Sequence, residues 1–496
     1  MKTPKKPIHV LFAAAEADPY IKIGGLGDVA GSLPLAIRQF TSQTDSVDQV
    51  DIRVVIPYHR SIPEKFTQLV RLGSYLLESG DKQAEVQVYE DKSAPLPIYF
   101  LDGDPIRQAA GIYSLDSSQD AEKYIFFSLA VLKLPRFLEW PIDILHANDW
   151  HTAASVYALK ALPGFQESTI RTVLSIHNLP YLGEGSQEVL KSWHVPSLTD
   201  EKLPDWAQLL PLPLGIATAD RIIPVSPGYA REILTPNFSS GLEILLRSRS
   251  DHILGIINGI NQEQWNPATD PYISSTYDPD HLQSKTPNKT GLMRSLGLDP
   301  NPDLPLVTMV TRMDYQKGVD IALSGLEVML DQPWQAVILG SGDPALTARC
   351  SALQEAYPDR VRFIPGFNPE FSHQLYAAAD IFLMSSRYEP CGISQLISMR
   401  YGTIPVAHAT GGLIDTITPT LPENPGTGYL YETNTPDFLV QTIHQALLDY
   451  NRKDFWHKIQ TNAMQQDFSW KMSAGKYVQQ YQNLLATNPI LTIQEE

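Results

Sequence analysis

The glycine-rich segment Lys22–Asp28 combines residue types and spacing that could bind an anion. It follows an apolar stretch, Ile8–Ala15, that predicts a buried strand, and precedes a stretch, 29–38, that predicts a helix. A strand, a glycine turn and a helix in this order direct free backbone N–H groups at an anion. Gly24 and Gly25 let the backbone approach a ligand closely, and the lysine adds a positive charge. Taken alone, the segment could also be only a tight connection.

A second loop of the same kind follows the apolar stretch 306–310, which predicts another buried strand. The loop 311–318 contains Arg312 and Lys317 and leads into a stretch, 319–330, with the apolar period of a helix. Both cations stand at the carboxyl end of a strand, where ligands bind in open α/β sheets. Arginine offers phosphate a two-pronged donor and lysine a point charge. Either residue singly could belong to a solvated basic loop, but with the first loop they predict two halves that grip one phosphorylated ligand.

The segment His146–His151, at the end of another predicted strand, has the residue types of a sugar site. Asp149, Trp150 and His151 supply a carboxylate, an indole and an imidazole. Sugar hydroxyls need hydrogen-bond partners, and the apolar face of a sugar ring packs on an aromatic plane. The alternative is that Asp149 caps a helix and Trp150 lies in the core.

Two more strand ends carry polar residues. His177 and Asn178 follow the predicted strand 171–176, and Tyr181 is close by, although a histidine in this position is usually structural. Glu389 follows the predicted strand 381–384 and precedes a predicted helix, where a carboxylate is electrostatically favoured. The alternative for Glu389 is that it only caps that helix.

Three further features complete the set of candidates. Thr410, Gly411 and Gly412 form a third candidate anion-binding turn. Cys391 could be mistaken for a nucleophile, but the sequence fixes no base beside it. The segment 340–342 resembles the start of a dinucleotide fingerprint and lacks the third glycine, so it is a weak indication of NAD binding.

The composition narrows the class of protein. A chain of 496 residues predicts two or more domains, since single cores stop growing near ~250–300 residues. Its 38 basic and 55 acidic residues give a net charge of −17, which argues against nucleic acid or an anionic membrane as partner.

The two cysteines, Cys350 and Cys391, fit a reducing compartment and offer no metal cluster. The apolar N-terminal stretch imitates a signal peptide, but Glu16 interrupts it, so we interpret it as the first strand. No apolar run approaches the ~18 residues of a membrane helix.

The order of predicted elements indicates an α/β protein with two halves. Predicted strands alternate with helical or looped segments in both halves, which predicts parallel sheets. The stretch between the halves is rich in Pro, Asp, Thr and Asn, which is typical of a linker. The first half is expected to close with a strand at 252–257. The expected parts are an N-terminal domain at 1–265, a linker region at 266–305, a C-terminal domain at 306–469 and a helix at 470–496.

Taken in order, these motifs resemble the bacterial-type glycogen and starch synthases of glycosyltransferase family 5. They extend over about nine tenths of the chain and are far more specific together than singly. The matching residues are Glu16, Lys22–Leu26, Asp28–Pro34, His146–His151, Ser175–Asn178, Val225–Ala230, Asn258–Ile260, Arg312, Gln316–Gly318, Glu389–Gly392 and Thr410–Thr416. The resemblance implies a GT-B fold, in which two Rossmann-like domains face an interdomain cleft and a C-terminal helix crosses back to the N-terminal domain.

The resemblance also implies a reaction. Glucose would pass from ADP-glucose to the non-reducing end of an α-1,4-glucan with retention of configuration, elongating glycogen or starch. The leaving diphosphate needs positive charge and backbone N–H groups as the glycosidic bond breaks. Related transferases often carry a second glutamate where this chain has Ile397, and no pair of carboxylates suited to a retaining glycosidase is apparent. A front-side route, in which the leaving phosphate takes the acceptor proton, fits best.

Site residues are carried over position by position from this resemblance. The expected catalytic residues are Lys22, His177, Arg312, Lys317 and Glu389. The expected donor-binding residues are Gly24, Gly25, Asp28, Asp149, Asn178, Thr410, Gly411 and Gly412. The expected acceptor-binding residues are Glu16, Trp150 and Tyr181. No metal and no cofactor are expected.

Other functions stay open at this stage. One alternative is a UDP-glucose-dependent or disaccharide-forming glucosyltransferase of the same fold. Less favoured are an NAD-dependent oxidoreductase and an inactive glucan-binding scaffold. The expected partners are ADP-glucose and α-1,4-glucan, with no nucleic acid and no membrane. The expected location is the cytoplasm, with association to glucan particles or granules as a further option.

Overall fold

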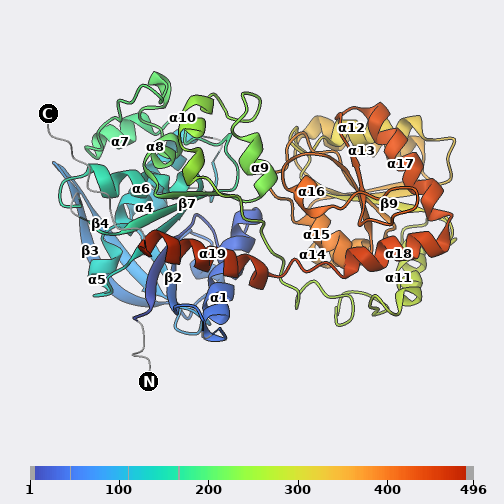
Figure 1. The fold of residues 1–496 in the computed structure, drawn as a ribbon, viewed down its shortest axis with the longest axis horizontal. Coiled ribbons are helices and arrows are strands. Elements are labelled where there is room, and N and C mark those ends of the chain that lie inside the picture. The colour runs from blue at the N-terminus through green and yellow to red at the C-terminus, as the bar shows by residue number, and fades with distance from the viewer. Residues whose placement is uncertain (1–5, 45, 110, 115, 166–167, 487–496) are drawn as a thin grey trace. The chain divides into compact units, whose positions relative to one another are not determined.

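The computed structural model describes residues 6–44, 46–109, 111–114, 116–165 and 168–486. The chain forms two compact units (Figure 1). Unit 1 comprises Met1–Gly259 together with Trp470–Glu496, and unit 2 comprises Ile260–Ser469. Each unit is built on its own sheet.

The sheet of unit 1 has eight strands in the order β3-β4-β5-β2-β1-β6-β7-β8. The strand β4 pairs antiparallel with both of its neighbours, β3 and β5. All other pairs, from β5 to β8 in the sheet order, are parallel. Parallel pairing of β1 with β6 aligns Ala13 with Ala147, so the carboxyl ends of these two strands lie side by side. The strands are β1 (Ile8–Ala13), β2 (Val50–Pro57), β3 (Val70–Ser79), β4 (Lys82–Glu90), β5 (Ile98–Asp102), β6 (Ile144–Asn148), β7 (Arg171–Ile176) and β8 (Arg221–Pro224).

The helices of unit 1 include two that matter for the site. The helix α1 (Gly25–Ser42) follows the first glycine loop, and α6 (Asp149–Ala161) follows β6 and packs between α4 and α8. Because α6 is covered in this way, its residues from Asp149 to Leu159 are buried throughout. The others are α2 (Ile62–Lys65), α3 (Asp104–Gln108), α4 (Ser117–Val131), α5 (Leu134–Phe137), α7 (Gln187–Ser192), α8 (Pro211–Thr218), α9 (Pro227–Glu232) and α10 (Glu243–Ser248).

The C-terminal helix α19 (Trp470–Ala486) belongs to unit 1 and packs along α1, as Figure 1 shows. Tyr477 and Tyr481 are fully buried. The hydroxyl of Tyr481 lies 2.7 Å from Nδ1 of the buried His146 in β6. The helix α19 therefore completes the core of unit 1.

The sheet of unit 2 has six strands in the order β11-β10-β9-β12-β13-β14, all paired in parallel. The strands are β9 (Leu306–Val310), β10 (Gln335–Gly340), β11 (Val361–Pro365), β12 (Ile381–Met384), β13 (Ile404–His408) and β14 (Tyr429–Tyr431). The helices are α11 (Thr286–Ser295), α12 (Val319–Val328), α13 (Pro344–Ala356), α14 (Pro369–Ala378), α15 (Ser394–Arg400), α16 (Gly411–Thr416), α17 (Pro436–Tyr450) and α18 (Lys453–Met464).

The first and last residues of unit 2, Ile260 and Ser469, are adjacent in the fold. Ile260 forms a parallel bridge with Ser469, and its N–H donates to the carbonyl of Phe468 at 2.8 Å. The two crossings of the chain between the units are thus joined by a backbone hydrogen bond.

The strand expected at 252–257 is not a full strand. Only a single bridge joins Ile253 to Ile222, although Leu254 and Ile256 donate to the carbonyls of Ile222 and Pro224 at 3.0 Å. Pro224 has no N–H to donate in return, so the ladder beside β8 stays incomplete.

The residues expected as a linker, 266–305, lie within unit 2 and include α11. Hydrogen bonds of Lys285 attach this stretch to the rest of unit 2. The buried Nζ of Lys285 donates to the carbonyls of Ala377 and Tyr401 at 2.8 and 3.0 Å. This stretch is therefore packed on the second sheet unit rather than extended between the units.

Candidate active site

The first glycine loop is occupied by a carboxylate of its own chain. Glu16, which is 1% exposed, accepts hydrogen bonds from the N–H groups of Ile23 and Gly24. Burial raises the pKa of Glu16, and these N–H groups lower it in part. One of the two amides expected to face an anion is therefore already paired within the protein.

Lys22 also has a partner inside the loop. Its Nζ lies 2.5 Å from Oδ1 of Asp28, and about a third of each side chain is exposed, 36% and 30%. Burial raises the pKa of Asp28, while the charge of Lys22 lowers it. The two residues expected to contact the donor separately form one ion pair.

Asp149 connects the ends of two strands. It follows β6 directly with a φ of 53°, a left-handed conformation that is rare for a residue other than glycine. Its Oδ1 accepts hydrogen bonds from the N–H groups of His177 at 2.7 Å and Asn178 at 3.3 Å. Burial raises the pKa of Asp149 to about 7, and the nearby charge of Glu16 adds to this. Strain and burial at one carboxylate are typical of functional sites.

His177 is held beside this carboxylate in a neutral state. Its Nε2 lies 3.0 Å from Oδ1 of Asn148, and burial lowers the pKa of its imidazole to about 3. The carboxylate, the imidazole and Asn178 thus form one polar cluster at the carboxyl ends of β6 and β7.

The aromatic residues expected near an acceptor differ in exposure. Trp150 is 8% exposed and packs edge-to-face on Tyr124 and against His151. Tyr181 is 53% exposed. Of these two residues, Tyr181 is the exposed one, whereas the indole of Trp150 belongs to the packing around α6.

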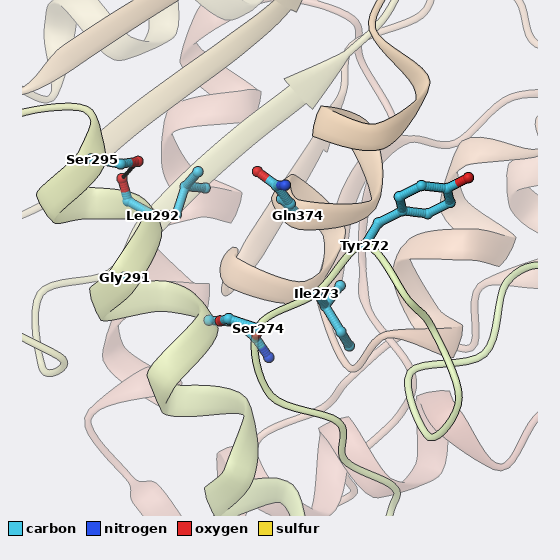
Figure 2. Close-up of a pocket in the computed structure, with 8 residues that line it drawn as sticks. Tyr272, Ile273, Ser274, Gly291, Leu292, Ser295 and Gln374 are labelled. Carbon is cyan, nitrogen blue, oxygen red and sulfur yellow. Dashed lines mark hydrogen bonds between the residues drawn. The ribbon is translucent and has the colours of Figure 1, made fainter.

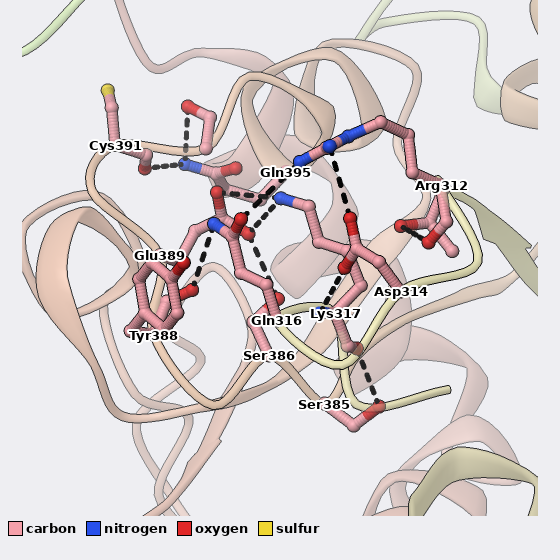
Figure 3. Close-up of polar contacts among 12 residues, drawn as sticks. Arg312, Asp314, Gln316, Lys317, Ser385, Ser386, Tyr388, Glu389, Cys391 and Gln395 are labelled. Atoms are coloured by element: carbon pink, nitrogen blue, oxygen red, sulfur yellow. Dashed lines mark hydrogen bonds and ion pairs between the residues drawn. The ribbon is translucent and has the colours of Figure 1, made fainter. Parts of the chain in front are cut away.

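In unit 2, Lys317 and Glu389 form a partly buried ion pair (Figure 3). Nζ of Lys317 donates to both carboxylate oxygens at 2.7 and 2.9 Å. Ser386 donates to Glu389 at 2.9 Å, and the Glu389 side chain is 5% exposed. The pair joins the loops that follow β9 and β12, which are neighbours in the sheet.

Arg312 is the exposed cation of the same cluster. Its guanidinium lies 3.1 Å from Asp314, and 56% of its side chain is exposed. The loop then turns into α12 at Gly318, whose φ is 60°. A Cβ on Gly318 would lie 1.9 Å from the carbonyl oxygen of Ser385, so glycine is required there.

The turn Thr410–Gly412 lies against the Glu389 loop. Gly412 donates to the carbonyl of Glu389 at 3.0 Å, and a Cβ on it would lie 2.3 Å from the carbonyl oxygen of Cys391. Gly411 has a φ of 47°. Cys391 is 4% exposed.

The predicted residues therefore fall into two clusters, one in each unit. The structure adds three residues that the sequence analysis did not select. Asn148 contacts His177, Tyr113 interacts with Glu16 and lowers the pKa of that carboxyl, and Ser386 donates to Glu389. Asn148 stands inside the quoted motif at the end of a strand, which could have pointed to it; the other two carry no such signal.

A separate cavity of about 410 Å³ lies in unit 2 and is lined by none of the predicted site residues (Figure 2). Its lining residues are Tyr272, Ile273, Ser274, Asn288, Gly291, Leu292, Ser295 and Gln374. Within the described ranges, no group of three or more His, Cys, Asp or Glu side chains could hold a metal ion. Among the same described residues, no helix is both long enough and apolar enough to cross a membrane.

Comparison with known proteins defines the class. Residues 9–248 match the starch synthase catalytic domain family, and residues 297–465 match glycosyl transferases group 1. The catalytic domain of starch synthase IV from Arabidopsis thaliana, solved bound to ADP and acarbose, superposes with a TM-score of 0.86 at 27% identity, covering 97% of this chain and 100% of that chain. A sucrose-phosphate synthase from Thermosynechococcus elongatus shares the fold, with a TM-score of 0.62 at 18% identity and the same coverage. The protein is a glycosyltransferase with the GT-B fold, as the sequence predicted.

Full-length relatives narrow the class further. Glycogen synthase of Lactobacillus acidophilus is 38% identical over 96% of this chain and 100% of its own length. Glycogen synthase of Clostridium novyi is 35% identical over 96% and 99%. The chain belongs to the bacterial glycogen synthase family.

Proposed function

We propose that the protein transfers glucose from ADP-glucose to the non-reducing end of an α-1,4-glucan with retention. The partly buried Lys317–Glu389 pair beside the exposed Arg312 carries this proposal, because it combines charge for a diphosphate with a carboxylate for sugar hydroxyls. The names of the relatives, and the ADP and acarbose bound to the Arabidopsis enzyme, support the choice of donor and acceptor.

We propose that the cations of unit 2 stabilise the leaving diphosphate. Arg312 supplies an exposed guanidinium, and Lys317 is held in one orientation by Glu389. Gly411 and Gly412, with Thr410, would approach the same phosphates through their backbone. Since Glu389 is paired with a lysine, it is poorly suited to attack an anomeric carbon, which favours the front-side route over a double displacement.

In unit 1, we propose that Asp149, His177 and Asn178 hold the donor glucose. Lys22, Asp28, Gly24 and Gly25 remain donor-side candidates. The ammonium of Lys22 has three N–H donors and one contact to Asp28, and its side chain is 36% exposed, so it can meet a phosphate as well. Glu16 and Tyr181 are proposed for the acceptor. Trp150 is proposed to act there through the packing of α6, since its indole is buried.

The test is transfer of radiolabelled glucose onto a glycogen primer, with ADP-glucose and UDP-glucose compared side by side. We expect a kcat/KM about 10–200-fold higher with ADP-glucose. The two donors differ only in the base, and contacts to one such group discriminate substrates over this range. A kcat/KM with UDP-glucose that is equal or higher would overturn ADP-glucose as the donor, but not the proposed glucosyl transfer. Absence of transfer from both donors would overturn the function. Lys458→Ala, which removes an exposed lysine outside the site, should transfer glucose as the wild type does.

We propose that this reaction takes place in the cytoplasm. Both cysteines are buried and free, which fits a reducing compartment.

A further inference from the structure

Asn148 is the last residue of β6 and its side chain is completely buried. Its Nδ2 donates to the carbonyl of Ala13, at the end of the neighbouring β1, at 2.9 Å. Its Oδ1 lies 3.0 Å from Nε2 of His177. The amide is therefore held between a fixed backbone group and the imidazole.

This arrangement determines which ring nitrogen carries the proton. A backbone carbonyl can only accept, so the group of Asn148 that faces Ala13 is the NH2 group and the oxygen faces His177. Because that oxygen can only accept, Nε2 must be the protonated nitrogen. Burial lowers the pKa of His177 to about 3, so the ring is neutral near pH 7 and Nδ1 keeps a lone pair. Within the described part of the chain, no group donates to that nitrogen.

We propose that Asn148 is a positioning residue that fixes the Nε2–H tautomer of His177 and so presents Nδ1 as an acceptor for a sugar hydroxyl. The tautomer follows from the contacts alone, whereas the identity of the ligand rests on the proposed function. A lone pair at Nδ1 selects a donor such as a hydroxyl and disfavours a phosphate oxygen. The site in unit 1 thereby distinguishes the sugar end of the substrate from its diphosphate end.

The first test is the ring-nitrogen NMR spectrum of the full chain labelled with ¹⁵N-histidine at pH 8. The signals of His177 are those absent from the spectrum of His177→Gln. We expect one protonated nitrogen, Nε2, and one unprotonated nitrogen, Nδ1. Protonation at Nδ1, or averaging of the two nitrogens, would overturn the proposal.

Two substitutions separate positioning from packing. Asn148→Asp keeps an acceptor for Nε2–H but places a carboxylate against the carbonyl of Ala13, whereas Asn148→Leu fills the space and accepts nothing. A positioning role predicts that the Asp variant keeps the single tautomer and that the Leu variant loses ~100-fold in kcat/KM, the scale of a misplaced site group. A purely structural role predicts the reverse order, with the buried carboxylate the more damaging change. If the Asp variant does not fold, the wild-type spectrum alone decides.

Adding ADP-glucose without a glucan acceptor tests the ligand contact. With binding established by calorimetry, we expect the Nδ1 signal to move and the Nε2 signal to stay. An unchanged Nδ1 signal at saturation would contradict the hydroxyl contact. A single tautomer in a protein that transfers no glucose would contradict the proposed function only, whereas full transfer with mixed tautomers would contradict this inference only.

Discussion

Replacing Lys317 by alanine removes the cation that faces the buried carboxylate of Glu389. The two groups are 2.7 Å apart, and only 5% of the Glu389 side chain is exposed. Breaking a buried ion pair by removing one partner costs ~3–5 kcal/mol. Since 20% of the Lys317 side chain is exposed and Ser386 still donates to the carboxylate, we expect a smaller loss, ~2–3 kcal/mol in the free energy of unfolding. We also expect kcat to fall by at least ~100-fold, the effect of losing a charged contact in the transition state.

The double variant Lys317→Ala/Glu389→Gln is the matched control. Removing the unpaired charge should restore most of the stability and none of the activity. Arg312→Ala should lower kcat as strongly while changing stability by less than ~1 kcal/mol, because its guanidinium is largely exposed. Urea unfolding and initial rates measure both quantities. A double variant no more stable than Lys317→Ala, or a single variant with near-normal turnover, would refute this reasoning.

Three other outcomes follow from the structure. The pKa of Asp149 is raised to about 7, so between pH 4 and pH 7 the folded state keeps a proton that the unfolded state, with a pKa near 4, has lost. The free energy of unfolding of the wild type should therefore fall by ~2–4 kcal/mol relative to that of Asp149→Asn as the pH rises from 4 to 8. Urea unfolding measures both proteins, and a difference that stays constant with pH would contradict this. Gly318→Ala should destabilise the chain by ~2–4 kcal/mol in thermal unfolding, because its positive φ and the carbonyl of Ser385 leave no room for a Cβ; an unchanged melting temperature would contradict it. Exhaustive chelation should leave transfer unchanged, because side chains and amides supply the positive charge; loss restored by magnesium or manganese would show otherwise.

The position of the candidate residues in the fold could be predicted from the sequence, because polar residues after apolar strands indicate the carboxyl edge of a parallel sheet. This applies to Asp149 after β6 and to Arg312 after β9. The sequence could not show which groups pair with one another. Lys317 and Glu389 are 72 residues apart, and each was expected to meet the substrate on its own. Lys22 and Asp28 are close in sequence, yet nothing in the pattern distinguishes an ion pair from two ligand contacts.

The parts of the fold that the pattern missed depend on pairing between distant segments. The strand β3 at the sheet edge has several exposed apolar residues, among them Leu72 and Leu76, so its pattern does not follow the alternation of a half-buried strand. The linker expected from composition is instead anchored by Lys285, whose partners lie more than 90 residues further on. Composition indicates a tendency to turn, but not what the segment packs against.

The bridge between Ile260 and Ser469 has a consequence for biosynthesis. Unit 2 is one uninterrupted stretch of chain, whereas unit 1 needs the last helix, α19, to cover α1 and to give His146 its partner Tyr481. Domains fold as units while the ribosome extends the chain, usually from the N-terminus. Here the order is inverted, because all residues of unit 2 are synthesised before α19. The eight-stranded sheet of unit 1 therefore lacks one of its covering helices until α19 has followed unit 2.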